Sequence, residues 1–209
     1  HPFFKDNPMN TQVLKLYLLQ HFIPAPHALV KNTHQVSPGE VVTFNFNGSV
    51  KNTRYWHLPN HESFLINDEE NALKQIDSSL NDSVEKELIS DVPVGAFLSG
   101  GVDSPLICYY AQKNKKENLK TLNISTSSFV HDESGIAKHI AMSIGANHDV
   151  IRIDGKFALN LLDDIISSIR EPFADISLIP TFIASKIIKS DATVVLSGDG
   201  GDELFFGYE

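Results

Sequence analysis

A six-residue loop that directly follows a short apolar run limits this chain to few folds. The apolar run is Val-Gly-Ala-Phe-Leu at residues 94–98, and the loop is Ser-Gly-Gly-Val-Asp-Ser at residues 99–104. The run has the length and composition of a buried strand, and a helical pattern follows it from about Ser104 to Gln112. A strand, a glycine turn and a helix in this order are typical of parallel sheets, in which ligands bind beyond the carboxyl ends of the strands.

Strands and helices continue to alternate after this unit. Short apolar strand patterns occupy residues 121–125, 149–153 and 193–196. Helical patterns occupy residues 133–144, 156–169 and 178–189. This alternation predicts an α/β fold, a parallel sheet with helices on both faces.

Residues 41–56 have a different pattern, that of an antiparallel hairpin. Two β-type runs, residues 41–46 and 50–56, flank Asn47-Gly48, which is a strong signal for a tight turn. Such a hairpin lies outside a parallel sheet built from strand–helix units. We therefore expect two domains, one over residues 1–60 and one over residues 65–209.

The first loop has the residues of an anion site. Gly100 and Gly101 allow a tight turn with accessible N–H groups, and the dipole of the following helix points at the same place. Ser99 and Ser104 add hydroxyl groups, and the absence of a lysine excludes a Walker A loop. Asp103 would repel a phosphate group unless a cation lay between them, so the loop predicts Mg²⁺.

A second glycine-rich loop, residues 197–203, follows the strand pattern at 193–196. It has three glycines and three acidic residues within seven positions, and their spacing does not fit an EF-hand. Because parallel strands end at the same edge of a sheet, we expect the two loops to lie close together. Taken alone, the first loop could also be an ordinary strand-to-helix turn with Ser/Asp capping, and the second a solvated acidic turn or a calcium loop.

The two loops and three further segments resemble, in order and spacing, the synthetase domain of glutamine-dependent asparagine synthetases, within the PP-loop ATP pyrophosphatase superfamily. The further segments are the strand at 121–125, the Asp-Glu helix start at 132–137 and the Glu-Pro-Phe segment at 171–175. The resemblance covers residues 65–209, and residues 1–60 resemble the end of the family's glutaminase domain. It implies an adenine nucleotide alpha-hydrolase-like fold, preceded by the antiparallel tail of an N-terminal glutaminase-like (Ntn-type) domain.

The resemblance also implies an activity and the residues that carry it. Family members amidate a carboxylate, aspartate by default, with ammonia derived from glutamine, and they cleave ATP to AMP and pyrophosphate with Mg²⁺. The implied ATP-binding positions are Leu98, Ser99, Gly100, Gly101, Asp103, Ser104, Ile124, Ser197 and Gly198. The implied catalytic residues are Asp103, Asp199 and Asp202, of which Asp103 and Asp202 hold the metal.

Three departures from the family pattern bear on activity. Pro105 stands where many relatives have a second Ser or Thr, although proline is tolerated in the first turn of a helix. Cys108 is expected to be a buried core thiol and cannot replace the family's N-terminal catalytic cysteine. The family also uses a lysine well after the second loop. We therefore expect a fragment, truncated at its C-terminus and inactive in isolation.

The remaining composition bears on partners and location. A net charge of −9 argues against a general affinity for nucleic acid or anionic membranes, and no apolar run reaches the about 18 residues of a membrane span. The single cysteine favours a reducing cytoplasm. We expect small-molecule substrates, and a homodimer is compatible with the resemblance. Two alternatives stay open: a relative with a different acceptor (a sugar carboxylate, a β-lactam precursor or a peptide) and a non-catalytic nucleotide-binding fragment.

Overall fold

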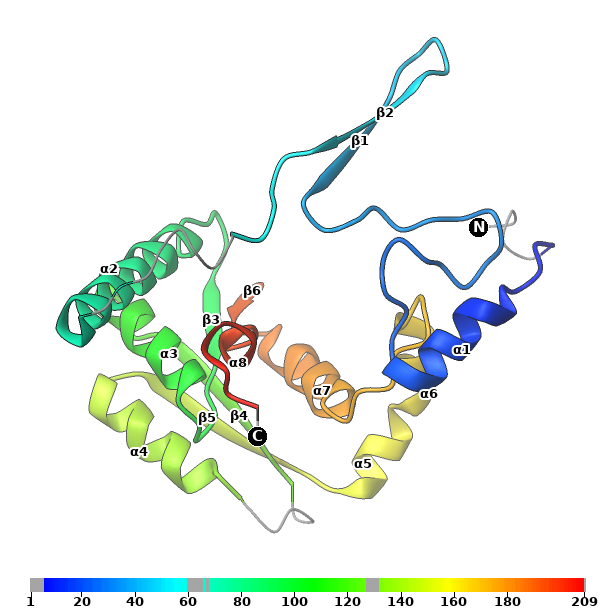
Figure 1. Ribbon diagram of the computed structural model, residues 1–209. Coiled ribbons are helices and arrows are strands. Elements are labelled where there is room, and N and C mark those ends of the chain that lie inside the picture. The colour runs from blue at the N-terminus through cyan, green and yellow to red at the C-terminus, as the bar shows by residue number, and fades with distance from the viewer. Residues whose placement is uncertain (1–5, 60–65, 67, 127–131, 209) are drawn as a thin grey trace. The chain divides into compact units, whose positions relative to one another are not determined.

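The computed structural model describes residues 6–59, 66, 68–126 and 132–208 (Figure 1). The chain divides into two compact units, which are described separately below. The first contains residues 1–65 and 164–178, and the second contains residues 66–163 and 179–209. Within the described ranges, no helix has both the length and the apolar character needed to cross a membrane.

A four-stranded parallel sheet forms the centre of the second unit, with the strand order β5-β4-β3-β6. The strands are β3 (Val94–Phe97), β4 (Lys120–Thr126), β5 (Asn147–Ile153) and β6 (Val194–Leu196). The central strand β3 pairs Phe97 with Leu122 of β4 and Ala96 with Leu196 of β6. The parallel sheet predicted from the alternating patterns is confirmed.

Helices pack on both faces of this sheet. Residues of α2 (Glu69–Glu87), α3 (Asp103–Asn114) and α4 (Ser134–Ile144) form one hydrophobic cluster with β3. Residues of α7 (Leu178–Ile188) form a second cluster with β4 on the other face. The strands carry alternate side chains to each face, so Ala96 and Leu98 join the first cluster while Phe97 joins the second. The predicted covering of both faces is therefore confirmed.

Local signals in the sequence account for the bounds of these helices. The Asp68 side chain accepts the N–H of Asn71 at 3.3 Å and begins α2, with Glu69 and Glu70 in the first turn, where acidic side chains favour the helix dipole. Gly145 ends α4 in the left-handed conformation, at a φ of 76°. The helical pattern predicted over 156–169 is two short helices, α5 (Gly155–Asn160) and α6 (Leu162–Ser168).

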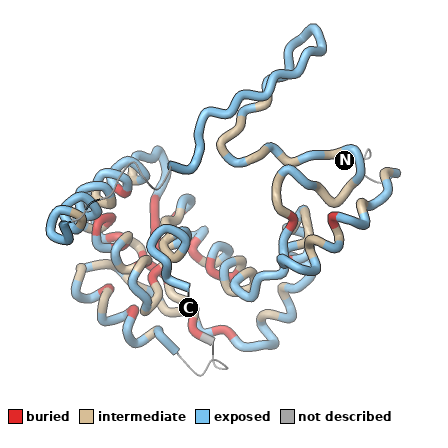
Figure 2. The backbone as a smooth tube through the Cα atoms, in the orientation of Figure 1, coloured by how far each residue is buried: buried red, intermediate tan, exposed pale blue. Residues whose placement is uncertain are grey.

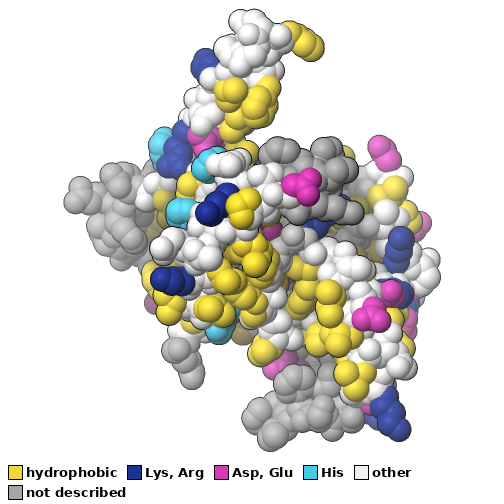
Figure 3. Space-filling view, turned by 90° about the vertical axis from the view of Figure 1, so that its right-hand side faces the viewer, with side chains coloured by type: hydrophobic (Ala, Val, Ile, Leu, Met, Phe, Trp, Pro, Cys, Tyr) yellow, Lys and Arg dark blue, Asp and Glu magenta, His cyan; other side chains and the backbone are white. Residues whose placement is uncertain are grey.

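The N-terminal part of the first unit contains a helix and a hairpin. α1 (Thr11–Gln20) begins at Asn10, whose side chain accepts the N–H of Gln12 at 3.1 Å. The strands β1 (Glu40–Phe44) and β2 (Val50–Arg54) pair antiparallel, which confirms the predicted hairpin. Figure 2 shows almost the whole hairpin exposed, and Figure 3 shows hydrophobic side chains on its surface.

Residues 164–178 belong to the first unit through contacts with its N-terminal residues. Gln35 donates from Nε2 to Oε2 of Glu171 at 2.7 Å, and the N–H of Ala174 donates to the carbonyl of His21 at 2.9 Å. The two compact units are thus not contiguous in sequence, whereas the domains expected from the sequence were the contiguous ranges 1–60 and 65–209. That domain assignment stays a prediction.

Candidate functional site

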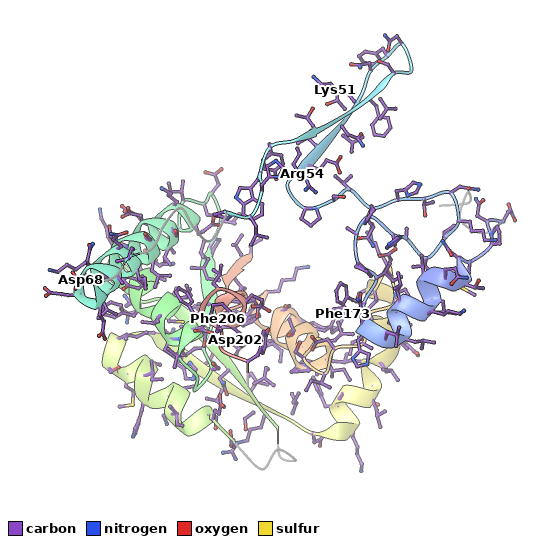
Figure 4. All side chains as sticks on the ribbon, in the orientation of Figure 1. Lys51, Arg54, Asp68, Phe173, Asp202 and Phe206 are labelled. Carbon is purple, nitrogen blue, oxygen red and sulfur yellow. The ribbon has the colours of Figure 1, made fainter. Side chains whose placement is uncertain are left out.

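A cavity of about 730 Å³ lies at the carboxyl ends of β3, β4 and β6 in the second unit. Its walls come from the loops after β3 and β6, the middle of β4, the first half of α7, the residue before α4, and α8 (Gly201–Phe205). Asp202, which lines the cavity from α8, is labelled in Figure 4. The parallel topology brings three strand ends to one edge, so residues from distant parts of the sequence surround a single hollow.

The first loop is held by its own hydroxyl groups. The N–H of Ser99 donates to Oγ of Ser104 at 2.8 Å, and the two Oγ atoms lie 2.8 Å apart. The N–H of Gly101 donates to Oγ of Ser99 at 3.2 Å. α3 begins at Asp103, and Val102 before it gives no capping side-chain bond. The N–H groups at this helix N-terminus therefore have no side-chain cap from Val102, and Asp103 is the acidic residue of the first turn.

The two glycine-rich loops touch each other, as the sequence predicts. A Cβ atom on Gly198 would lie 2.6 Å from the backbone nitrogen of Ser104 and 3.0 Å from Cβ of Asp103. A Cβ atom on Gly201 would overlap the carboxyl group of Asp103. The second loop can therefore approach Asp103 this closely only because both of these positions lack a side chain.

The acidic residues of the second loop have separate local partners. Ser197 donates from Oγ to Oδ2 of Asp199 at 3.0 Å, and the N–H of Asp199 donates back to the same hydroxyl at 3.4 Å. Asp202 lies in the first turn of α8, and its carboxyl group lies against Gly207, where an added Cβ atom would overlap it. Asp199 and Asp202 thus both belong to the loop that contacts Asp103, and both line the cavity.

All of the predicted site residues except Gly100 line the cavity. Gly100 instead gives its N–H to Oε2 of Glu133, at 3.0 Å, and Glu133 itself lines the cavity. Sequence reasoning did not assign Glu133 to the site. The only signal for it was its place in the Asp-Glu helix start at 132–137, which was used for the resemblance and not for chemistry.

Two further contributions to the cavity were also missed. Asn123 of β4 donates from Nδ2 to the carbonyl of Leu98 at 2.9 Å and so joins β4 to the residue that follows β3. The first half of α7 forms one wall, with Pro180, Thr181 and Ala184. Neither feature has a glycine-rich or acidic pattern, so neither stands out in the sequence.

The charge of the cavity suits a metal-bound polyanion better than a free one. Its lining contains four carboxylates and, among the residues that the structure describes there, no lysine or arginine; the acids are Asp103, Glu133, Asp199 and Asp202. Mg²⁺ accepts one or two carboxylate ligands and takes the rest of its oxygen shell from phosphate and water. In the described parts of the chain, no three His, Cys, Asp or Glu residues converge as a metal site. Asp103 and Asp202 both line this cavity, and their role as metal ligands stays a prediction.

Pro105 and Cys108, the two residues tied to departures from the family pattern, do not disturb the first loop. Pro105 lies in the first turn of α3 and leaves the helix intact. Cys108 is fully buried, and burial raises the pKa of its thiol to about 12, so it is the inert core thiol that the sequence predicts.

Comparison with known proteins identifies the family of this chain. A model of the asparagine synthase family matches residues 75–209. The glutamine-hydrolyzing asparagine synthetase 1 of Bacillus subtilis (strain 168) is 32% identical over 203 residues, which are 97% of this chain and 32% of that protein. The putative glutamine-hydrolyzing asparagine synthetase 2 of Methanocaldococcus jannaschii is 32% identical over 206 residues, which are 98% of this chain and 39% of that protein. The chain thus spans about a third of the length of these relatives.

Among solved structures, the NH3-dependent NAD synthetase from Campylobacter jejuni subsp. jejuni NCTC 11168 has a TM-score of 0.46 and 21% identity, over 65% of this chain and 60% of that chain. The family match covers the second unit's sheet from β3 to β6, both glycine-rich loops and every residue of the cavity lining. Since it also spans more than half of the 209 residues, the chain belongs to the asparagine synthase family.

Proposed function

We propose that the protein carrying this chain amidates a carboxylate, by default that of aspartate, with ammonia derived from glutamine, and that it cleaves ATP to AMP and pyrophosphate. The observation that carries the proposal is the contact between the two glycine-rich loops at Asp103, beside one cavity. The family membership and the relatives' printed names support the same reaction class.

The chemistry requires the site to stabilise a leaving pyrophosphate. When a carboxylate attacks the α-phosphorus of ATP, negative charge accumulates on the departing group, and fixed N–H dipoles and a metal ion lower the barrier by stabilising it. The first loop and the N-terminus of α3 would supply the dipoles. Mg²⁺, held by Asp103 and Asp202, would neutralise part of the charge.

The other cavity residues suggest where the rest of the substrate lies. Leu98 directly follows β3 and Ile124 lies within the neighbouring strand β4; both would hold the adenosine part, together with Ser197 and Gly198 after β6. Asp199 lies on the second loop and would face the acceptor carboxylate or the ammonia that attacks it. No lysine or arginine lines the described cavity, so charge neutralisation there would depend on the metal and the N–H groups.

Exchange of labelled pyrophosphate into ATP, measured on the whole protein that carries this chain, tests this proposal. The expected result is exchange that depends on aspartate and falls at least about a hundredfold in Asp103→Asn, since loss of a group that stabilises transition-state charge typically costs that much. Asp82→Asn is the matched control, because Asp82 is exposed on α2 and makes the same charge change away from the cavity. If no carboxylate in a panel of amino acids, sugar acids and peptides supports exchange, the proposal is wrong. If another carboxylate supports exchange and aspartate does not, the proposed reaction class is kept and that carboxylate replaces aspartate as the acceptor.

A further inference from the structure

Glu133 has a contact that the proposed reaction does not use. Its Oε2 accepts the N–H of Gly100 at 3.0 Å, although the two residues are 33 positions apart. The neighbouring N–H groups of Ser99 and Gly101 donate to hydroxyl groups of the loop itself. Gly100 is thus the loop position whose N–H faces a carboxylate from a different element.

The backbone around Glu133 holds this carboxylate at the loop. A Cβ atom on Gly100 would lie 2.8 Å from Cβ of Glu133, so the two backbones are packed against each other. Asp132 accepts the N–H of Ser134 at 3.0 Å, which supports the start of α4. Glu133 occupies the N-cap position of α4, yet its side chain makes no capping bond. Its carboxylate is directed to the loop and not to its own helix.

A carboxylate that accepts a loop N–H occupies the kind of place that a phosphate oxygen takes in an anion site. Pyrophosphate that uses the N–H of Gly100 must either displace the Glu133 carboxylate or lie beside it. Two such negative groups repel each other, and a divalent cation on the pyrophosphate reduces that repulsion. Glu133 is exposed, so its side chain has room to turn towards solvent.

We propose that Glu133 competes with pyrophosphate for the N–H of Gly100 and thereby makes the site discriminate against pyrophosphate that carries no metal ion. This inference rests on the proposed function, because it assigns a selectivity to the same site. Glu133 is thus a specificity-determining residue, distinct from Asp103 and Asp202, which would hold the metal itself.

Calorimetric titration of the 209-residue chain with inorganic pyrophosphate tests the inference, once in EDTA and once in excess Mg²⁺. Glu133→Gln keeps an acceptor and removes the charge, so we expect metal-free binding to become about fivefold tighter or more, and binding with Mg²⁺ to change by less than about twofold. Glu133→Ala removes the acceptor as well, so metal-free binding should again become tighter. Circular dichroism checks that the fold is retained in this variant.

Asp132→Asn is the matched control, because it makes the same charge change one residue away and Asn can still accept the N–H of Ser134. We expect it to leave both titrations unchanged. Equal effects of Asp132→Asn and Glu133→Gln would show only a long-range charge effect and overturn the inference. Weaker metal-free binding in both Glu133 variants would make Glu133 a support of the loop, and loss of binding only with Mg²⁺ would make it a metal ligand; either result overturns the inference.

The inference and the proposed function fail in different ways. If the unaltered chain binds pyrophosphate with Mg²⁺ but Glu133→Gln changes neither titration, only the role of Glu133 is wrong. If neither the unaltered chain nor any variant binds pyrophosphate in either condition, the assignment of the loop as a pyrophosphate site is wrong, and the inference falls with it.

Discussion

The strand β3 and the hairpin of the first unit differ in burial. They also differ in which residues stabilise the turn that follows the strand. Val94, Gly95 and Ala96 of β3 are buried, whereas all five residues of β2 are exposed (Figure 2). The loop after β3 has hydrogen bonds of its own and also contacts the second loop and the start of α4, both distant in sequence. The hairpin turn is held by bonds within the turn, such as that from the N–H of Gly48 to the carbonyl of Asn45 at 2.9 Å.

This difference bears on where a functional site can form. A turn stabilised only by its own residues needs no partner, and it brings no distant side chains together. A loop at the end of a buried parallel strand is positioned by its neighbours, so residues from several elements meet there. In the described residues of the second unit these are Asp103, Glu133 and Asp199, which come from three separate segments.

The largest expected difference between the parallel sheet and the hairpin is in how much a substitution to alanine lowers the free energy of unfolding. Leu119 is fully buried in the cluster that joins β3 to α3 and α4, so Leu119→Ala should lower the free energy of unfolding by about 2–5 kcal/mol. Phe44 of the hairpin is 77% exposed, and Phe44→Ala should cost less than about 1 kcal/mol. Urea unfolding measures both, and similar losses would show that the hairpin is supported as strongly as the sheet.

A smaller contrast concerns two glycines. An alanine at 201 would place its Cβ against the Asp103 carboxyl group, so Gly201→Ala should weaken binding of Mg²⁺-pyrophosphate about tenfold or more, a misplacement effect of the size expected for a positioned group. Gly48→Ala meets no neighbouring atom, but its φ of 82° should cost the hairpin about 1 kcal/mol. Calorimetry should show unchanged binding in Gly48→Ala. Intact binding in Gly201→Ala would mean that contact between the loops is not needed.

The smallest contrast uses two tyrosines. Tyr110 of α3 is buried and donates to Oδ1 of Asp77 in α2 at 2.6 Å, so Tyr110→Phe should cost about 1–2 kcal/mol. Tyr55 near the hairpin is 71% exposed, and Tyr55→Phe should cost almost nothing. Chemical unfolding at neutral pH measures the pair.

The same bond makes a pH-dependent prediction for Tyr110. Its bond to Asp77, together with burial, raises the pKa of the phenol from 10.0 to about 12. The protonated phenol is therefore favoured in the folded protein, so this stabilisation is present below pH 10.0 and is lost as the pH rises towards about 12. Tyr110→Phe should remove that part of the alkaline loss of stability. If the loss of stability above pH 10.0 is the same in Tyr110→Phe as in the unaltered chain, the bond from Tyr110 to Asp77 does not stabilise the protonated phenol.

Much of the second unit could be predicted from the sequence because its signals are local. Each strand pattern, such as residues 94–98, is a short apolar run, and each glycine-rich loop follows such a run directly. Parallel topology then requires the two loops to meet, which the contact of Gly198 with Ser104 confirms. The Asn47-Gly48 turn likewise predicted the hairpin.

The parts that were missed depend on contacts between distant residues. Glu133 reaches Gly100 because α4 packs on the loop, and the sequence spacing of 33 residues contains no sign of that contact. Gln35 and Glu171 bond across 136 positions, which groups residues 164–178 with the N-terminal unit. The helical pattern at 156–169 continues through Leu161, where the structure ends α5 and begins α6.

Backbone resonances of the glycines test the central claim most directly, since the chain has 12 glycines and both regions contain them. The chain is labelled with ¹⁵N-glycine, and Mg²⁺-pyrophosphate is added. The account predicts shifts at the amides of Gly100, Gly101, Gly198 and Gly201, and none at Gly39 or Gly48 of the first unit. Shifts confined to one loop, or no shifts in either loop at saturating ligand, would contradict the claim that the two loops bind the pyrophosphate group together.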